Sequence, residues 1–408
     1  MKINCLISSV LLVSAGAVSA FESTKVLPKG VRNLDIRGLY TTTSKKTNKD
    51  GNVEPLAEPL FRPLRFRNIV DGEKGLKKTQ LQAFLISQGI KPEDTAGEFT
   101  ADLNAQINVW APIFAWGLTE NWTVAAALPY YSASTDIKVG FRTNEGADRF
   151  MAALTTNSMN NFQSAVEAAE KFQNAPGRLN TRLSENEYEP LGRWNKTAFG
   201  DLTIASKYLA HNGDRIKVAS QLGFVAPTGR KDSPDILTDL PFGDGQWDLF
   251  AGLLSDQFLS SSVFLNQFVK YTYQAPGRKD VRWKTYDETV LAERRSTDFK
   301  LGDKVDAGVS MQFEQETTGI TGGLGGLYFR KYGDRYDVDY LASKNELQRA
   351  TDQNALYWQA RIGYSTLPAF KRKEFAAPLT ATLEYRKQYS SRNVPVTDFT
   401  QLDLNLFF

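Results

Sequence analysis

Residues that could carry out acid–base or nucleophilic chemistry are scarce in this chain. It has one histidine, His211, and one cysteine, Cys5. Many hydrolytic enzymes use a histidine as general base or as part of a catalytic dyad. His211 stands in the sequence His-Asn-Gly-Asp, which is typical of a tight hairpin turn, so its simplest role is that of a polar turn residue. We therefore predict that the protein is not an enzyme and has no catalytic residue.

Metal and nucleotide sites are also poorly supported by residue spacing. Asp232, Asp235 and Asp239 share one polar stretch and could bind calcium, but their spacing does not match an EF-hand, and a solvated acidic loop is the simpler interpretation. Residues 322–326 are rich in glycine, yet they lack the Lys-Ser/Thr of a phosphate-binding loop and precede no helical pattern. We predict no metal site and no cofactor.

The charge balance argues against a nucleic-acid partner. The chain has 49 basic residues, one of which is Lys2 at the N-terminus, and 46 acidic residues. Such a nearly neutral chain offers no broad basic surface for nucleic acid. Charged side chains of both signs instead recur at alternate positions within apolar stretches.

The elements that must position these side chains show a strict period of two. In the last eleven residues, apolar and polar side chains alternate, with Leu402, Leu404, Leu406 and Phe408 set against Gln401, Asp403 and Asn405. Residues 99–113 sustain the same alternation. Globular strands average about five or six residues, whereas transmembrane strands need roughly nine to eleven. The pattern favours transmembrane strands, and a soluble β-protein with a docked last strand is the alternative reading of the C-terminal segment.

The N-terminus predicts export from the cytoplasm. Residues 1–20 begin with the basic Lys2, continue with a short apolar stretch and end with small residues at the positions that signal peptidase requires. We predict residues 1–20 to be a cleaved signal peptide. The apolar stretch is too short to span a bilayer as a helix, and no other run of roughly 18 apolar residues occurs, which excludes a helical membrane protein.

The C-terminus predicts the cellular location of the protein. A closing strand that ends on an aromatic residue, here Phe408, resembles the signal that the barrel-assembly machinery of the bacterial outer membrane reads. That machinery and the outer-membrane lipids are therefore the expected partners, together with a small-molecule solute.

Strand-like segments recur along the chain, and their connections alternate between short and long. The segments lie at 99–113, 122–137, 199–210, 215–227, 246–258, 263–274, 304–316, 320–336, 355–367, 379–389 and 399–408. Outer-membrane barrels have short periplasmic turns, longer external loops and usually an even number of strands. A weaker pattern at 30–42 supplies a twelfth strand. The sequence thus predicts an all-β fold within residues 21–408, a transmembrane antiparallel up-and-down barrel of about 12 strands.

Two long segments fall between the predicted strands. Residues 140–198 are polar and helix-prone, and we predict that they form a long external loop. Residues 43–97 contain an amphipathic helical pattern near 76–88. They form either a first external loop with a short helix or, together with the residues from 21 onward, an N-terminal plug within the lumen.

Three short motifs within residues 199–274 resemble a known family. Phe199-Gly200-Asp201-Leu202 opens one strand, Ala226-Pro227-Thr228-Gly229 closes the next, and Gly243-Asp244-Gly245-Gln246-Trp247-Asp248 opens the one after. Their order resembles outer-membrane proteins of the meta-pathway phenol-degradation type, which are distantly like the fatty-acid and aromatic-hydrocarbon channels. The resemblance implies an outer-membrane transporter. It covers only this region and the terminal aromatic residue, and the two long segments have no counterpart in it.

In such a barrel the polar face of each strand lines the lumen. Charges are tolerable there, whereas on the lipid face they cost about 2–4 kcal/mol at mid-bilayer. The predicted lumen-lining residues are Asp102, Asn104, Gln106, Lys207, Arg215, Lys217, Phe264, Phe268, Lys270, Asp306, Glu314, Arg361, Glu384, Arg386, Gln401, Asp403 and Asn405. The charges either pair across the lumen and fill it or line a channel as acidic and basic ladders. The two phenylalanines would suit an aromatic or amphipathic solute, or would pack against a plug.

Two further patterns concern the wall itself. The glycines of 322–326 thin it, which permits either a bend with a lateral exit or room for a tightly packed lumen. Aromatic residues near strand ends are predicted to anchor the barrel at the membrane interfaces: Trp110, Trp116, Trp122, Tyr130, Tyr131, Trp247, Tyr271, Tyr273, Tyr364 and Tyr389.

Taken with the absence of catalytic residues, these patterns predict an outer-membrane channel or transporter for small aromatic or amphipathic solutes. The alternative is a closed structural or surface-interaction barrel whose external loops bind a partner.

Overall fold

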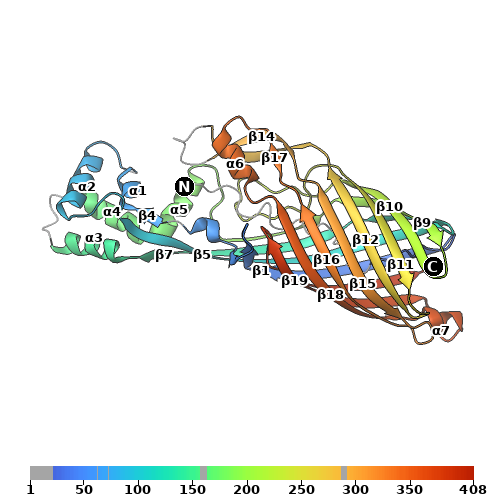
Figure 1. Ribbon diagram of the computed structural model, residues 1–408. Coiled ribbons are helices and arrows are strands. Elements are labelled where there is room, and N and C mark those ends of the chain that lie inside the picture. Colours follow the sequence, from blue (N-terminus) through green and yellow to red (C-terminus); the bar gives the residue numbers. More distant parts are fainter. Residues whose placement is uncertain (1–21, 62, 72, 157–162, 286–291) are drawn as a thin grey trace.

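The computed structural model describes residues 22–61, 63–71, 73–156, 163–285 and 292–408, and its main feature is a closed antiparallel β-barrel (Figure 1). Twelve strands form the wall. In order around the barrel they are β1 (Arg32–Thr43), β20 (Asp398–Phe407), β19 (Leu379–Arg392), β18 (Gln353–Ser365), β16 (Ile320–Lys331), β15 (Lys304–Glu314), β12 (Val263–Gln274), β11 (Asp248–Phe258), β10 (Ile216–Ala226), β9 (Leu202–Asn212), β6 (Trp122–Ala127) and β5 (Thr95–Thr119). The predicted signal peptide lies outside the described residues.

The predicted fold class and strand number are confirmed. The ring closes at β1, which pairs with β20 on one side and with β5 on the other. In the β1–β20 pair, Leu34 lies opposite Leu406 and Ile36 opposite Leu404, so the apolar faces of the two strands coincide. Because both edges of every wall strand are paired, the backbone presents no open sheet edge to lipid.

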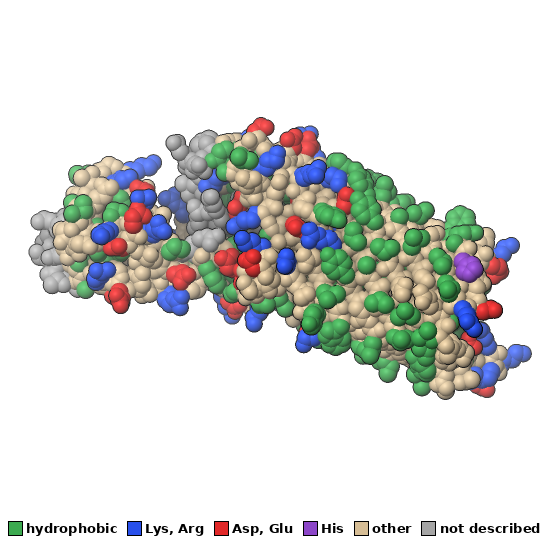
Figure 2. All heavy atoms as spheres, viewed as in Figure 1, with side chains coloured by type: hydrophobic (Ala, Val, Ile, Leu, Met, Phe, Trp, Pro, Cys, Tyr) green, Lys and Arg blue, Asp and Glu red, His purple; other side chains and the backbone are tan. Residues whose placement is uncertain are grey.

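Apolar side chains cover the outside of the barrel. Those that point outward and are exposed include Leu222, Leu253, Leu324, Ile362 and Leu383, and Figure 2 shows hydrophobic side chains along the barrel wall, with charged ones gathered toward its ends. This distribution is the one that a lipid-facing band requires.

The two ends of the barrel differ in their connections. At the turn end, short turns, the helix α7 (Leu367–Lys371) and the chain terminus Phe408 are found. At the loop end, long connections carry β2 (Lys45–Thr47), β3 (Val53–Pro55), η1 (Glu58–Leu60), α5 (Ala175–Ser184), β13 (Gly277–Trp283), β14 (Glu293–Lys300), β17 (Arg335–Tyr336) and α6 (Leu341–Gln348). Within the described part of the chain, every helix is too short or too polar to cross a membrane.

One side of the barrel continues far beyond the loop end. β5 has 25 residues, so it reaches roughly 80 Å at about 3.3 Å per residue. Its lower half pairs with β6, and its upper half pairs with β7 (Tyr130–Thr143), which in turn pairs with β8 (Arg193–Phe199). The predicted strands 122–137 and 199–210 are thus each split, at Leu128-Pro129 and at Gly200-Asp201. We call the part formed by upper β5, β7 and β8 the extension.

A small helical subdomain, here called the knob, caps the extension at the point farthest from α7 (Figure 1). It consists of β4 (Pro63–Arg65), α1 (Phe66–Asp71), α2 (Gly75–Ser87), α3 (Glu145–Thr156) and α4 (Gln163–Gln173). Its own buried cluster includes Phe66, Leu81, Phe84 and Phe150, with the rings of Phe66 and Phe150 5.5 Å apart. The long segments 43–97 and 140–198 therefore meet outside the barrel.

The lipid-facing band can be tested with a single charge. Leu253 lies in the middle of β11 and is 58% exposed on the outer face. We expect Leu253→Arg to lower the free energy of unfolding by about 2–4 kcal/mol, because the guanidinium would face hydrocarbon. Urea unfolding in lipid vesicles, followed by tryptophan fluorescence, measures the change.

A matched control is Asn104→Arg, which places the same charge on the outer face of the extension, where Asn104 is exposed. This variant should unfold like the unmodified protein, since that face meets water. Equal effects of the two substitutions would contradict the assignment of a lipid band.

Candidate functional site

The barrel encloses a cavity of about 1880 Å³. Its lining includes Lys46 and Arg349 at the loop end and Leu367 and Arg372 at the turn end. One continuous space is therefore lined by residues from both ends of the barrel.

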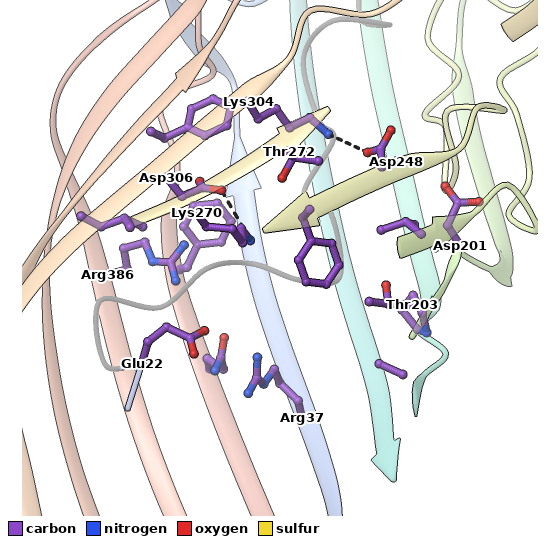
Figure 3. A pocket seen from close by; sticks show the side chains of 18 of the residues that line it. Glu22, Arg37, Asp201, Thr203, Asp248, Lys270, Thr272, Lys304, Asp306 and Arg386 are labelled. Carbon is purple, nitrogen blue, oxygen red and sulfur yellow. Dashed lines mark ion pairs between the residues drawn. The ribbon is translucent and has the colours of Figure 1, made fainter. Parts of the chain in front are cut away.

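Ion pairs occur around much of the wall of this cavity. Lys270 lies 3.5 Å from Asp306 on the neighbouring strand, and Lys304 of β15 lies 3.5 Å from Asp248 of β11, across β12. Figure 3 shows both pairs inside the barrel. Further inward pairs join Arg37 to Asp35 (3.5 Å) and to Asp403 (3.2 Å), and Arg386 to Glu384 (3.4 Å). Each of these cations is placed beside a carboxylate, which offsets part of the cost of burying charge.

A strip of the cavity wall on two adjacent strands is apolar. Ile113 and Ala115 of β5 and Ala125 and Ala127 of β6 line it, and around the ring β5 and β6 lie across from β15 and β16. The lumen therefore has an amphipathic cross-section, in which an apolar strip on β5 and β6 faces the paired charges of β12 and β15 and is flanked by charged residues of β1 and β9.

The glycines of β16 leave room for this packing. In the ladder, Gly323 lies between Gln312 of β15 and Arg361 of β18. Because Gly323 has no side chain, the Arg361 guanidinium reaches across β16 to the Gln312 amide oxygen and lies 3.8 Å from Glu314. β16 keeps an unbroken register with both neighbours, so the wall has no lateral gap at residues 322–326, and the missing side chains supply room for a packed lumen.

The segment that precedes β1 runs inside the barrel. Thr24 is fully buried, and its backbone N–H and its hydroxyl both donate to Asp256 Oδ2, at 2.9 and 2.6 Å. Asn266 donates to the other oxygen of the same carboxylate at 2.6 Å. A buried carboxylate held by three donors is a strong anchor, and it fixes Thr24 to the barrel wall.

Further contacts hold residues 22–27, which we call the lumen segment. Lys207 donates to the Ser23 carbonyl at 2.9 Å, Gln312 donates to the Glu22 carbonyl at 3.2 Å, and Lys25 pairs with Glu314. The Leu27 N–H donates to the Thr123 hydroxyl at 2.7 Å. The lumen segment crosses from the charged wall to the small side chains of β6 and narrows the cavity. Residues 45–60, in contrast, cover the loop end.

The three sequence motifs converge on one carboxylate. Asp201 accepts hydrogen bonds from the backbone N–H of Gly229 (2.7 Å) and of Asp244 (3.3 Å). A Cβ on Gly229 or Gly243 would lie under 3.0 Å from neighbouring atoms, so side chains are excluded there. Asp201 thereby joins the two ends of the loop 227–247, whose Leu237, Phe242 and Asp244 line the cavity.

Asp244 itself is buried in a polar cluster. Gln274 donates to it at 3.1 Å, and the Asp248 carboxylate lies in the same cluster. Burial, assisted by the nearby Asp248 charge, raises the pKa of Asp244 to about 7.

The structure places ten of the predicted lumen residues on the cavity lining: Lys207, Lys270, Asp306, Glu314, Arg361, Glu384, Arg386, Gln401, Asp403 and Asn405. Phe264 and Phe268 point inward but are buried, 2% and 7% exposed, and Lys25 of the lumen segment lies over the Phe264 ring. Lys217 packs over the Phe258 ring. Arg215 lies exposed at the turn to β10, outside the cavity lining.

Three predicted lumen residues are on the wrong face. Asp102, Asn104 and Gln106 of upper β5 are exposed on the outside, while Leu103, Ala105 and Ile107 are buried inside. The cause is the extension: this half of β5 lies beyond the membrane band, so its outer face meets water and its inner face packs on α5 and the loops. Among the aromatic residues, Tyr131 is likewise inward, stacked on Phe242 at 5.1 Å.

Several lumen residues were not predicted. Asp35 and Arg37 belong to a strand with a weak apolar pattern, and Asp248, Asp256 and Lys304 alternate with apolar residues that could have revealed them. Residues 22–27 carry no strand pattern, so only the fold places them in the lumen.

The other polar groups considered at the outset have structural roles. His211 lies exposed near the end of β9, at the turn end. Asp239 pairs with Arg230, and Asp235 pairs with Arg282 (2.6 Å) and Arg294 (3.1 Å). In the described ranges, His, Cys, Asp and Glu side chains form no group of three or more that could hold a metal ion.

Comparison with known proteins supports the fold. No protein-family model matches the chain, and no curated protein matches it. Among solved structures, it is similar to an outer membrane channel from Pseudomonas putida F1, with a TM-score of 0.52 and 10% identity over 94% of this chain and 98% of that one. It is less similar to a Pseudomonas aeruginosa FadL homologue, with a TM-score of 0.37 and 9% identity over 95% and 93% of the two chains. At 10% identity, the first of these likenesses shows a shared fold and nothing more.

The Thr24 anchor predicts how accessible the lumen segment is. With Ser23→Cys as a probe, we expect slow reaction with a membrane-impermeant maleimide, and about tenfold faster reaction when Asp256→Ala is added, because charge-assisted hydrogen bonds of roughly 1.5–3 kcal/mol are lost. Labelling kinetics followed by mass shift measure the rate.

The control for this experiment is Asp102→Ala, which removes an exposed carboxylate on the extension. It should leave the labelling rate of Ser23→Cys unchanged. Equal rates with and without Asp256→Ala would show that this carboxylate does not hold the segment.

The raised pKa of Asp244 predicts a pH dependence of stability. An acid whose pKa is higher in the folded state favours folding only while protonated, so the free energy of unfolding should fall as pH rises from about 4 to about 7. We expect Asp244→Asn to reduce this slope, measured by urea unfolding at several pH values. Asp232→Asn in the same loop is the control and should keep the slope; a slope unchanged by Asp244→Asn would contradict the assignment.

Proposed function

We propose that this protein is a channel of the bacterial outer membrane for small amphipathic or aromatic solutes. The observation that carries the proposal is the single cavity of about 1880 Å³, lined by residues from both ends of the barrel. By the rule for outer-membrane barrels, the turn end faces the periplasm and the loop end faces outward. A solute would enter below the external loops and pass beside the lumen segment.

The cross-section of the lumen supports the solute class. A ring or short alkyl group can contact the apolar wall of Ile113, Ala115 and Ala125, while a carboxylate or hydroxyl faces the charged wall. Arg386 and Lys270 lie on that wall beside carboxylates. An anionic group of the solute can therefore replace the protein carboxylate beside either cation, and the cation keeps a negatively charged partner. A small hydrated ion would make no use of the apolar strip.

The family resemblance also supports a channel or transporter. The three motifs that resemble the meta-pathway phenol-degradation type meet at Asp201, where they hold the loop 227–247 over the cavity. We extend the proposal to that type of transporter. The proposal includes export directed by a signal peptide at residues 1–20. It also includes insertion by the barrel-assembly machinery, which would recognise Phe408.

A closed surface-interaction barrel is the second candidate. It is favoured by the lumen segment, which narrows the cavity, and by the knob, which projects beyond the loop end with its own core. In that case the external loops would bind a partner and the lumen would carry no flux.

Conductance in planar bilayers separates these functions. We expect the protein to give stable conductance steps, and Ala125→Trp to lower them severalfold because the indole would fill the apolar side of the lumen. Liposome swelling with an aromatic carboxylate such as benzoate measures solute flux in parallel.

The matched control is Ala251→Trp, which places the same ring on the exposed outer face of β11. This variant should conduct like the unmodified protein. If the unmodified protein shows neither conductance nor solute flux, the channel proposal is overturned and the closed barrel takes its place.

A further inference from the structure

The extension carries a second cavity, a polar groove of about 600 Å³. Its polar lining residues include Thr42, Lys45, Asn104, Gln106, Ser134, Asp136 and Arg193. They come from the end of β1, the start of β2, and from β5, β7 and β8. Ala105 and Val396 are the apolar residues of the lining, so the groove is dominated by amides, hydroxyls and charges.

The polar side chains of the groove are not engaged with one another. Within the described ranges of the chain, the side chains of Lys45, Arg193 and Asp136 form no ion pair, and those of Asn104 and Gln106 form no hydrogen bond. The lumen shows the opposite arrangement, since its inward lysines and arginines are paired with carboxylates. The hydroxyls of Thr43 and Thr135, which also line the groove, donate to the carbonyls of Val396 and Thr238. The amides of Asn104 and Gln106 and the two cations Lys45 and Arg193 are left for a ligand.

The groove lies just beyond the lipid band. Trp110 pairs with Tyr130 at the top of the band, and both are exposed on the outer face. Gln106 and Ser134 pair four residues farther along the same strands, which is about 13 Å at 3.3 Å per residue. For strands tilted by about 35–45°, the groove sits roughly 10 Å above the aromatic residues. That is on the aqueous side of the aromatic belt, within reach of a lipid headgroup that carries sugars.

Its chemistry suits a phosphorylated sugar. Lys45 and Arg193 can bind phosphate oxygens, and the amides and hydroxyls of Asn104, Gln106 and Ser134 can bind sugar hydroxyls. We propose that the groove binds the phosphorylated saccharide headgroup of a glycolipid in the outer leaflet. This inference rests on the outer-membrane location proposed above and adds a lipid-binding site to it. A protein partner would need an apolar centre, which this groove does not have.

Native mass spectrometry of the detergent-solubilised full chain tests the proposal. The probes are a bisphosphorylated lipid A that carries inner-core sugars and the same glycolipid after enzymatic removal of its phosphates. We expect the unmodified protein to retain the phosphorylated probe, and the double variant Lys45→Gln, Arg193→Gln to bind it about tenfold more weakly. Asn104→Ala with Gln106→Ala should weaken both probes.

The matched control is Lys138→Gln with Lys196→Gln, which removes two cations of the extension outside the groove lining. This control should bind like the unmodified protein, and heat-modifiable migration in gels checks that each variant is folded. Equal loss in the control and groove variants, or equal retention of both probes by the unmodified protein, would overturn the proposal.

The channel proposal and the groove proposal can be contradicted independently of each other. Groove variants should keep the conductance of the unmodified protein, and Ala125→Trp should keep its glycolipid. Loss of glycolipid binding with intact conductance therefore supports the groove, whereas a protein that binds glycolipid and conducts nothing overturns only the channel.

Discussion

The closed hydrogen-bonded ring is the constraint on which the rest of the structure depends. Lipid offers no partner for a backbone N–H or C=O, so a β-structure that spans a membrane must pair every strand on both sides. Here the ring closes where β1 lies between β20 and β5, and the backbones of Arg32 and Phe408 hydrogen-bond each other at the seam. Once the ring is closed, the pleat fixes which side chains face lipid and which face the lumen.

The lumen follows from this geometry. Inward side chains cannot reach bulk water freely, so charges there are stable only beside opposite charges or strong hydrogen bonds. Asp256 is one example, because its carboxylate is held by Thr24 and by Asn266. Arg361 is another, since the missing side chain of Gly323 lets it cross a strand to Gln312. The result is a cavity lined mostly by charges of both signs, with an apolar strip on β5 and β6.

Much of the fold could be predicted from the sequence. The environment of each face of β5 could not. Alternation identified residues 99–113 as a strand, and its parity is the same along the whole of β5. The environment outside the strand changes midway, however: Phe114 and Trp116 face the lipid band, whereas Asp102 and Asn104 face water above it. Assigning polar residues to the lumen was therefore wrong in the upper half, because periodicity reports two faces without saying what each face meets.

The sequence by itself determined most of the wall strands, their number and the end of the barrel at which the last strand finishes, since these depend on local alternation, turn residues and the even strand count of a closed barrel. Only the tertiary structure decided that residues 22–27 enter the lumen and that the motifs at Asp201, Gly229 and Asp244 meet. It also decided that β5 and β7 leave the membrane to carry the knob. These features depend on contacts between residues that are far apart along the chain, and no local pattern specifies such contacts.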